Sequence, residues 1–544
     1  MCGIYAQLGS FKLNDALKCL KKLEYRGYDS YGIGYDNNII YKKVGRISFF
    51  DKNNDITVTK AICHTRWATN GKVSEKNAHP HSSSNNDIIL VHNGILENED
   101  LIKNTFFINH KFKSDTDSEV VAELLSLFIR KYEPFDAIKR VMEIIKGSYA
   151  IIFMIKDDPN IYYIKNKSSL IIGYNDKDYY LASDIYAFPQ NTKFYKHLSD
   201  ESYGRIGPGL YSNDNNLFIP YDFDFKEQKE HIMLDEIEEE KKLAQNLYEN
   251  FEVSNDILNL IYEAKEFVLI GSGSSYYAAE YIAKMIEEKL QKRARAFLPS
   301  EFEYNDIYKD GTFIFISQSG ETADVLNAID SINPKRALLL TNRIESQMAI
   351  KIKNVIDIKA GIERAVASTK SFNQSVLAFY LLINKIKAEE SSKIKTYIRN
   401  LDEIKNSFDQ NIAKLISKMD NVFYLGQGYD YIISKEGALK LKEIAYIPTE
   451  GYSISELKHG SLALVSPQTM VIGLSSGNSF FLPCLNEVKA RGGHVLFIEN
   501  KFKDHTLGAL ALSRYVQLIA YYTSLEKGNN PDFPRNLAKS VTVI

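Results

Sequence analysis

The sequence predicts a multidomain protein: an α+β domain of stacked antiparallel sheets with helices, followed by two tandem α/β domains with parallel sheets. Three observations support this prediction. The chain has 544 residues, which is too long for one hydrophobic core. Short apolar runs broken by turn residues fill the first part, whereas strands and helices alternate after residue 265. The second pattern then recurs, which indicates an internal duplication.

The first part of the chain is β-rich. Helical periodicity appears in it only at 14–25 and 114–132. Apolar runs between Asn, Asp, Gly and Pro turns predict strands within four segments: 61–67, 87–94, 148–166 and 170–184. This pattern favours stacked sheets with helices. A charged segment at 225–251 follows, and we expect a helix there whose acidic run faces solvent.

Strands and helices alternate in the rest of the chain. EFVLIGSGSSYYAAEYIAKMI (266–286) has a buried strand, a Gly/Ser loop and a helix. GTFIFISQSGETADVLNAI (311–329) repeats this arrangement, and RALLLTN (336–342) adds a third strand. Such alternation predicts a parallel sheet covered by helices on both faces.

The same arrangement appears again after residue 420. NVFYLGQGYDYIISKEGALKLKEI places Gly428 where the first copy has Gly273, and MVIGLSSGNS places Ser476 where the first copy has Ser319. The two positions are 46 residues apart in the first copy and 48 in the second. HVLFIEN (494–500) matches the third strand. Matched elements at matched spacing predict two related domains in tandem.

Composition excludes several classes of protein. The net charge is −2, with 67 basic and 69 acidic residues, which argues against a nucleic-acid-binding surface. No apolar run is long enough for a membrane helix, and the first residues lack the pattern of a signal peptide. The four cysteines are too sparse for a disulfide scaffold and lack metal-binding spacing, so we expect a reducing, cytoplasmic compartment.

Cys2 directly follows the initiator methionine. If Met1 is removed, the thiol and a free α-amino group lie on one residue, and the amine, which titrates near pH 8, can serve as the base that activates the thiol. Taken alone, Cys2 is better explained as a small buried apolar residue.

Polar motifs elsewhere in the first domain favour the catalytic interpretation. Arg66 in HTRWATNG could bind a carboxylate with its planar guanidinium, and Asp117 in SDTDSEVV could hold an ammonium. Asn93 and the backbone of Gly94 in VHNGILEN could form an oxyanion hole. Trp67 is the single tryptophan and could cover the site. Each of these residues taken alone could be structural.

Together with EYRGYDS, these motifs resemble the N-terminal-nucleophile glutaminase domain of class II glutamine amidotransferases, over roughly residues 2–215. The resemblance implies hydrolysis of glutamine to glutamate and ammonia through a thioester on Cys2, with Asn93 and Gly94 as the oxyanion hole. It implies four substrate-binding residues on the matching motifs: Arg66, Trp67, Thr69 and Asp117.

Three Ser/Thr-rich loops occur in the second part, at 271–275, 317–322 and 365–372. None is a nucleotide P-loop, because no Gly-Lys-Thr follows the glycines. Hydroxyl groups and backbone N–H groups at helix N-termini suit a phosphate monoester. Ordinary helix capping would explain any one loop, but three together favour a ligand.

Candidate acid–base residues follow. EGALKLKEI places Glu436, Lys440 and Glu443 on one helix face, where they could move protons at carbon or form a surface salt-bridge ladder. His459 in ELKHG lies in a predicted loop. Lys539 in PRNLAKSVTVI has apolar neighbours, which suits a nucleophilic amine, although a docked tail with Lys539 reaching water would look the same.

These segments resemble the two sugar isomerase (SIS) domains of the glucosamine-6-phosphate synthases, also called glutamine–fructose-6-phosphate aminotransferases (isomerising). With the glutaminase half, the resemblance covers nearly the whole chain in the same order. It implies transfer of the glutamine amide nitrogen to fructose 6-phosphate with ketose-to-aldose isomerisation, giving glucosamine 6-phosphate and glutamate. This reaction is the first step of hexosamine and UDP-N-acetylglucosamine biosynthesis.

The resemblance also implies roles for single residues. Lys539 would form a Schiff base at C2, Glu443 would move a proton from C1 to C2, and Glu436 and Lys440 would assist. His459 would open the sugar ring, entering from a neighbouring subunit of a homodimer or higher homo-oligomer. The implied sugar-phosphate contacts are Ser272, Gly273, Ser274, Ser275, Ser317, Gln318, Ser319, Thr322, Val366 and Ser368.

The resemblance implies an internal ammonia channel and neither a metal nor an organic cofactor. The sequence departs from the family pattern at Asn70, Ser272, Ser274 and Ser461. A deglycase or isomerase for another sugar phosphate remains an alternative, because the sugar's identity rests on resemblance alone. The predicted domains are a glutaminase domain (2–215), a linker (216–245), a first SIS domain (246–395), a second SIS domain (396–528) and a catalytic tail (529–544).

Overall fold

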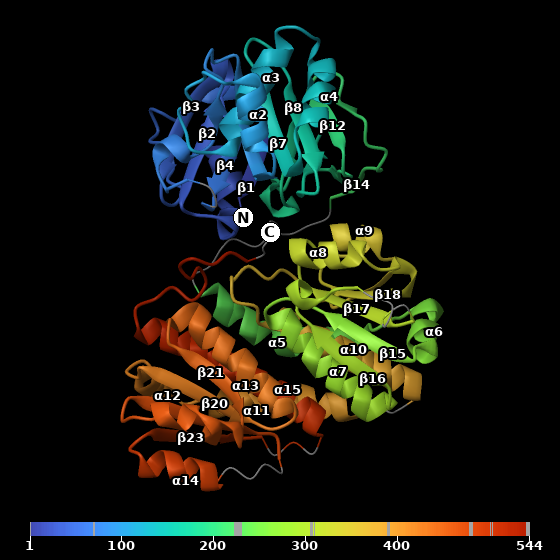
Figure 1. Cartoon of the computed structure of the whole chain (residues 1–544), viewed down its shortest axis with the longest axis vertical. Coiled ribbons are helices and arrows are strands. Elements are labelled where there is room, and N and C mark those ends of the chain that lie inside the picture. The colour runs from blue at the N-terminus through green and yellow to red at the C-terminus, as the bar shows by residue number, and fades with distance from the viewer. Residues whose placement is uncertain are drawn as a thin grey trace. The chain divides into compact units, whose positions relative to one another are not determined.

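The computed structural model describes residues 2–68, 71–221, 231–304, 308, 310–388, 392–477, 482–500, 502 and 504–539. The chain divides into two compact units. The N-terminal unit consists mainly of Met1–Glu227, and the C-terminal unit is Gln228–Lys539 (Figure 1).

The N-terminal unit contains two antiparallel sheets. The first has the strand order β14-β11-β9-β10-β1-β4-β2-β3 and the second the order β13-β12-β8-β7-β6-β5. The strands of the first sheet are β1 (Gly3–Lys12), β2 (Ser30–Tyr35), β3 (Ile39–Val44), β4 (Thr57–Arg66), β9 (Ile171–Tyr174), β10 (Tyr179–Ala182), β11 (Phe194–His197) and β14 (Ile219–Pro220). Those of the second are β5 (His81–Ser82), β6 (Ile88–Leu96), β7 (Gly147–Ile155), β8 (Ile161–Asn166), β12 (Ser202–Ile206) and β13 (Tyr211–Ser212).

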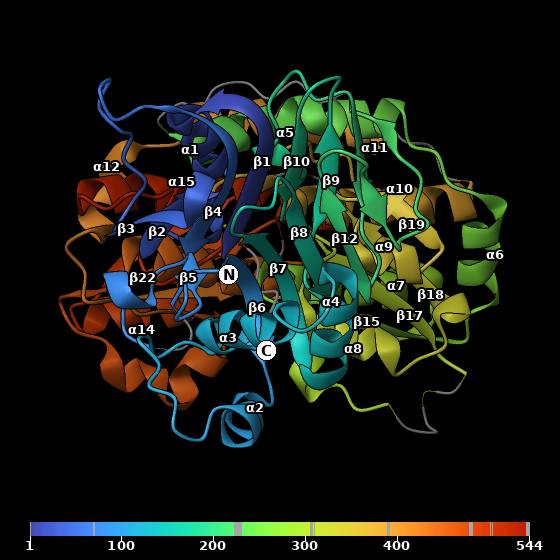
Figure 2. The same ribbon diagram turned by 90° about the horizontal axis from the view of Figure 1, so that it is seen from above.

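Helices cover the outer faces of both sheets. Apolar residues of β1 and β4 pack against those of β6 and β7 to form the core between the sheets. Helix α1 (Leu13–Lys21) packs on the other face of the first sheet, against β1 and β4 (Figure 2). Helices α3 (Asp117–Ile129) and α4 (Pro134–Ile144) pack on the second sheet, with α2 (Glu99–Phe106) against α3. The unit therefore has four layers, helix–sheet–sheet–helix.

The C-terminal unit contains two parallel sheets. One has the order β16-β15-β17-β18-β19 and the other β21-β20-β22-β23, and every pairing in both is parallel. The strands of the first are β15 (Glu266–Ile270), β16 (Arg293–Phe297), β17 (Thr312–Ser317), β18 (Ala337–Thr341) and β19 (Asn354–Asp357). Those of the second are β20 (Asn421–Gly426), β21 (Thr449–Ser453), β22 (Thr469–Ser475) and β23 (His494–Glu499).

One large apolar core joins the two halves of this unit. Helices α7, α10, α13 and α15 contribute most of its buried side chains. The helices of the unit are α5 (Ile232–Glu249), α6 (Asn255–Glu263), α7 (Ser274–Leu290), α8 (Ala323–Asp330), α9 (Gln347–Lys351), α10 (Lys370–Lys387), α11 (Ser392–Ser407), α12 (Gln410–Ile416), α13 (Tyr429–Lys440), α14 (Leu482–Ala490) and α15 (His505–Glu526). None of the helices in the described ranges is long and apolar enough to span a membrane.

The predicted fold class and the duplication are confirmed. The first strand of each half, β15 or β20, lies second in its sheet, between the next two strands along the chain. The glycine turn after that strand has the same conformation in both halves, with φ 59° and ψ −129° at Gly273 and φ 62° and ψ −122° at Gly428. Only glycine adopts such angles at low cost.

One expectation about α5 is wrong. The acidic run at its start does not simply face solvent, because Glu236 is 4% and Glu240 0% exposed. Glu240 accepts hydrogen bonds from the side chains of Asn373 and Tyr397. The pattern of charges resembled a solvated face, but helices α10 and α11 cover it and supply polar partners.

Candidate active sites in the two units

The first site lies where β1, β4 and β6 begin or end next to one another. Cys2 immediately precedes β1, and its Sγ accepts a hydrogen bond from the N–H of Trp67 at 3.4 Å. The side-chain amide of Asn93 donates to the carbonyl oxygen of Cys2 at 2.8 Å. The pairing of β1 with β4 thus places the thiol between the HTRW and HNG motifs.

Gly94 has the backbone geometry that close approach requires. Its φ is +129°, and a Cβ atom at this position would lie 1.9 Å from the carbonyl oxygen of Ser148 on β7. No other residue fits there without moving β7. Gly94 and Asn93 are neighbours on β6, so both lie close to Cys2.

Arg66 and Asp117 lie buried in the same region, at 3% and 6% exposure. Burial lowers the pKa of the Arg66 guanidinium, while electrostatic interactions with Cys2, Asp29 and Asp117 oppose this shift. Arg66 donates to the carbonyl oxygens of Gly71 and Lys72, and Asp117, at the start of α3, accepts from the N–H of Leu96. The electrostatic coupling places Arg66 in the field of both Cys2 and Asp117.

Two further residues complete this region. Trp67 packs edge-on against Tyr28, with ring centroids 5.7 Å apart. Asp29, which the sequence analysis did not single out, accepts a hydrogen bond from the N–H of Ala68 at 2.9 Å and so ties the EYRGYDS loop to HTRWAT. Thr69, a predicted substrate contact, lies outside the described residues.

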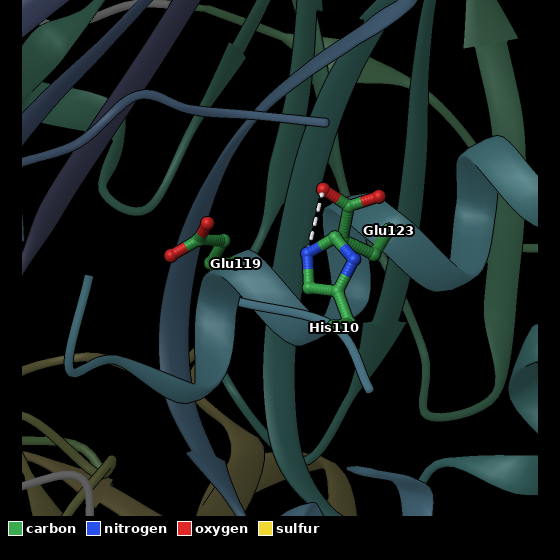
Figure 3. A group of neighbouring side chains, drawn as sticks. All are labelled: His110, Glu119 and Glu123. Carbon is green, nitrogen blue, oxygen red and sulfur yellow. Dashed lines mark ion pairs between the residues drawn. The ribbon is translucent and has the colours of Figure 1, made fainter. Parts of the chain in front are cut away.

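A separate cluster of His110, Glu119 and Glu123 lies against α3 (Figure 3). His110 Nε2 lies 3.4 Å from Glu123 Oε1. Both carboxylates already accept backbone hydrogen bonds, Glu119 from Lys113 and Ser114, and Glu123 from Ser84. These bonds hold two loop segments against α3, which accounts for the burial of both acids.

The second site is built around Lys440 in the C-terminal unit. Helix α13 ends at Lys440 and continues as a five-residue π-helical turn, Leu441–Ala445. Lys440 Nζ lies 3.5 Å from Glu436 Oε1 and 2.8 Å from Glu443 Oε2. The three residues predicted to share a helix face therefore meet, and Glu436 and Lys440 are fully buried rather than part of a surface ladder.

Burial and mutual charge set the protonation of this cluster. Burial by itself would lower the pKa of Lys440, but the carboxylates of Glu436 and Glu443 outweigh it and raise the pKa. Burial raises the pKa of Glu436 to about 7, against the opposing effect of Lys440. Lys440 is consequently a permanent cation, and Glu436 is an acid that can gain or lose a proton near neutral pH.

Two of the three predicted phosphate loops lie at the carboxyl ends of β15 and β17. Gly273 is exposed, and a Cβ atom there would meet nothing within 4 Å. Ser317 Oγ accepts a hydrogen bond from the N–H of Gly320, and Thr322 occupies the N-cap position of α8. This edge of a parallel sheet, with helix N-termini following the strands, suits anion binding. Ser272, Gln318 and Ser319 lie in the same two loops, and Ser275 is the second residue of α7.

Ser274 behaves differently from its neighbours. It is buried at the first position of α7, and its hydroxyl donates to Glu436 Oε1 at 3.0 Å. It therefore connects the first half of the unit to the acid–base cluster of the second half.

The corresponding loops of the second half carry their own carboxylate. Asp430 stands two residues after Gly428, where the first half has Ser275 two residues after Gly273. Its Oδ2 accepts the N–H of Ser476, the counterpart of Ser319. An internal anion thus lies in the second pair of loops, so the first pair is the better candidate for a phosphate.

The C-terminal tail brings Lys539 into the described part of the unit. Lys539 Nζ lies 2.6 Å from Glu363 Oε2, and the two side chains are 5% and 0% exposed. The tail is therefore docked with its lysine buried rather than reaching water. Val366, in the third predicted loop, donates its N–H to the carbonyl oxygen of Asp532, and Ser368 Oγ lies 2.7 Å from Ser371 Oγ.

Glu363 was missed by the sequence analysis. It is separated from Lys539 by 176 residues, and no motif or spacing connects them. Glu363 also adds to the electrostatic effects that raise the pKa of Lys440, after the larger effects of Glu436 and Glu443. His459 is not brought to this site within the described chain; it lies exposed at the end of the turn Glu456–His459.

Comparisons with known proteins match each of the two units to a known family. A family described as "Glutamine amidotransferase domain" matches residues 64–190, and one described as "SIS domain" matches 260–385 and 415–522. The glutamine–fructose-6-phosphate aminotransferase (isomerizing) of Sulfurisphaera tokodaii is 33% identical over 593 aligned residues, and that of Fusobacterium nucleatum 35% over 619; both alignments cover 100% of each chain.

A solved structure is similar to the C-terminal unit. The C-terminal domain of glucosamine-fructose-6-phosphate aminotransferase from Francisella tularensis matches with a TM-score of 0.51 and 27% identity. The match covers 56% of this chain and 98% of that chain.

Proposed function

Because the chain belongs to the family of glutamine–fructose-6-phosphate aminotransferases (isomerising), we propose that it moves the amide nitrogen of glutamine to fructose 6-phosphate through the two sites described above. The products are glutamate and glucosamine 6-phosphate. The observation that supports this most is the presence in one chain of a thiol beside an amide donor and of a buried lysine beside an acid–base cluster.

In the first half-reaction, Cys2 Sγ attacks the amide carbonyl of glutamine. The α-amino group of Cys2, freed when Met1 is removed, accepts the thiol proton. Asn93 Nδ2, now 2.8 Å from the Cys2 carbonyl, and the N–H of Gly94 stabilise the oxyanion. Ammonia leaves, and water releases glutamate from the thioester. Arg66 and Asp117 bind the carboxylate and amino groups of the substrate, with Trp67 and Thr69 beside them.

In the second half-reaction, the loops after β15 and β17 and the loop of Val366 and Ser368 bind the sugar phosphate. His459, from a neighbouring subunit of a homodimer or larger homo-oligomer, opens the ring, and Lys539 forms an imine at C2. Ammonia replaces Lys539. Glu443 moves the proton from C1 to C2, with Lys440 as a fixed positive charge nearby and Glu436 beside it.

The same proposal divides the chain into a glutaminase domain (2–215), a linker (216–245), two SIS domains (246–395 and 396–528) and a catalytic tail (529–544). A cytoplasmic location fits the four cysteines, all of which are free thiols. A SIS enzyme for another sugar phosphate is the alternative, and product analysis distinguishes it.

The test is a coupled assay with glutamine and fructose 6-phosphate, in which glutamate and glucosamine 6-phosphate are both quantified. We expect the two products in a one-to-one ratio. Cys2→Ala should abolish glutamate release while ammonium salts restore part of the amino sugar. Formation of glutamate without any amino sugar would show that the acceptor is a different sugar phosphate.

A further inference from the structure

Lys539, the predicted nucleophile of the second site, forms a buried ion pair with Glu363. The two charged atoms are 2.6 Å apart, and Glu363 is fully buried. Burial alone would raise the pKa of Glu363, but Lys539 and several hydrogen bonds outweigh burial and lower the pKa to about 2. The carboxylate is therefore ionised at every working pH and faces a lysine with little access to water.

Glu363 is held rigidly by the start of α10. Its Oε1 accepts hydrogen bonds from the N–H groups of Thr369 and Ser371 at 2.9 and 3.1 Å. Its Oε2 accepts from the hydroxyl of Ser371, which in turn lies 2.7 Å from the hydroxyl of Ser368 in the predicted sugar loop. A carboxylate fixed in this way defines one location for the lysine nitrogen.

A second buried acidic side chain fixes the segment that carries Glu363. Glu236 Oε1, on α5, accepts hydrogen bonds from the N–H groups of Arg364 and Ala365. Asp532 in the tail accepts from the N–H groups of Ile232 and Met233 at the start of the same helix. The Glu363 loop and the tail that bears Lys539 are thus attached to one helix, which limits their relative movement.

We propose that Glu363 is a positioning residue for Lys539, which holds its nitrogen at one point and remains paired with it from the free ammonium to the protonated imine. The inference rests on the proposed role of Lys539 as the imine-forming amine. The long lysine side chain otherwise has many rotamers, and a single fixed location reduces the entropy cost of reaching the carbonyl.

The charge balance of imine formation supports this role. A lysine ammonium and a ketone carbonyl give a protonated imine and water: the nitrogen–C2 bond forms, the C2–oxygen bond breaks, and two nitrogen protons leave with the oxygen. The nitrogen is positive before and after the step. One carboxylate therefore stabilises both states, and a positive imine nitrogen withdraws electrons from C2, which makes C2 easier for ammonia to attack.

The experiment traps the imine in the full-length protein with borohydride, in the presence of fructose 6-phosphate, between pH 5.5 and 9.5. Mass spectrometry of the Lys539 peptide gives the rate. In Glu363→Gln the amide oxygen can still cap α10, but the charge is lost. We expect trapping at saturating sugar to slow at least tenfold. The pH dependence of trapping should also change, because the fixed negative charge 2.6 Å from the reacting nitrogen is lost.

Two further variants make the result specific. Glu363→Asp keeps the charge but shortens the reach, so trapping should slow while the pH of half-maximal trapping stays near that of the wild type. Glu239→Gln is the matched control, because Glu239 pairs with the neighbouring Lys370 at 2.7 Å and is 54% exposed. It should behave like the wild type in both rate and pH dependence.

The outcomes separate the inference from the proposed function. A wild-type protein that forms no imine at Lys539 overturns the role of Lys539 and that of Glu363 with it. If the wild type is trapped but Glu363→Gln keeps the same pH dependence, only the inference fails, and Glu363 serves solely as the cap of α10. Glutamate release, measured in parallel, shows that each variant is folded in its N-terminal unit.

Discussion

Lys440 is a fully buried cation whose two carboxylate partners determine what it can do. Because Glu436 and Glu443 raise its pKa, Lys440 cannot serve as a base, and its contribution is a fixed positive charge. Glu436, in contrast, can change its protonation near neutral pH, because burial raises the pKa of this carboxyl to about 7. Its Oε2 has no hydrogen-bond partner among the described residues. The protons that move near neutral pH are thus on the carboxyl side of the pair.

Replacing Lys440 by methionine should destabilise the C-terminal unit by about 3–5 kcal/mol at pH 8, because a buried carboxylate is left without its counter-ion. The loss should be smaller at pH 6, where Glu436 is protonated. The double variant with Glu436→Gln should be more stable than the single variant, since it carries neither charge. Calorimetric unfolding of the three proteins measures these differences. Equal losses at both pH values would contradict the assignment.

The fold of the C-terminal unit could be predicted largely from the glycine-rich turns that follow β15 and β20. The Gly-rich loops and their duplication were visible because each glycine serves a local backbone requirement. Glu363 and Glu236 were not visible. Their burial depends on partners 176 and 128 residues away, and no local pattern encodes such a distance. The acidic run of α5 even suggested the opposite environment.

The N-terminal unit shows the same division. Cys2, Asn93 and Arg66 were found because their motifs stand at the ends of recognisable strands. Asp29 was overlooked, although its motif was noted, because its partner is a backbone N–H in another loop. A side chain that holds two loops together has no recognisable pattern in the sequence around it.

Gly426, the last residue of β20, and Gly428, two residues later, provide a prediction for this element. At Gly428 a Cβ atom would lie 3.4 Å from Lys284, so Gly428→Ala costs only backbone strain, about 1–3 kcal/mol. At Gly426 the Cβ atom would lie 2.3 Å from the carbonyl group of Asp430, which the turn into α13 cannot move away. Gly426→Ala should therefore destabilise the unit more than Gly428→Ala. Thermal unfolding of both variants tests the order, and the reverse order would show that the turn tolerates a shift of α13.

The two units differ in the titratable groups that they bury: histidines in the N-terminal unit and carboxyls in the C-terminal unit. In the N-terminal unit, burial lowers the pKa values of four histidines: His64, His79, His81 and His92. The rings of His64 and His79 stack at 3.9 Å, so a proton on one would also repel the others. In the C-terminal unit, burial raises the pKa of several carboxyls, among them Glu236 to about 8, Glu240 and Glu436 to about 7, and Asp430 to about 6.

The two kinds of pKa shift have opposite effects on how the stability of a unit depends on pH. A histidine with a lowered pKa binds its proton only after unfolding, so its contribution is complete above pH ~6.5 and is lost as the pH falls below it. A carboxyl with a raised pKa binds a proton more readily when folded. Its contribution is present below pH ~4 and is lost as the pH rises through the values given above.

Acidification from pH 8 to pH 5.5 should therefore destabilise the N-terminal unit and stabilise the C-terminal unit, each group contributing up to about 1.4 kcal/mol per pH unit. Trp67 is the only tryptophan in the chain, so its fluorescence reports unfolding of the N-terminal unit alone. Calorimetry of the same samples records both transitions. We expect the fluorescence midpoint to fall and the other calorimetric transition to rise as the pH is lowered. A parallel shift of both transitions would mean that the histidines are already protonated in the folded unit or that the carboxyls stay ionised in theirs.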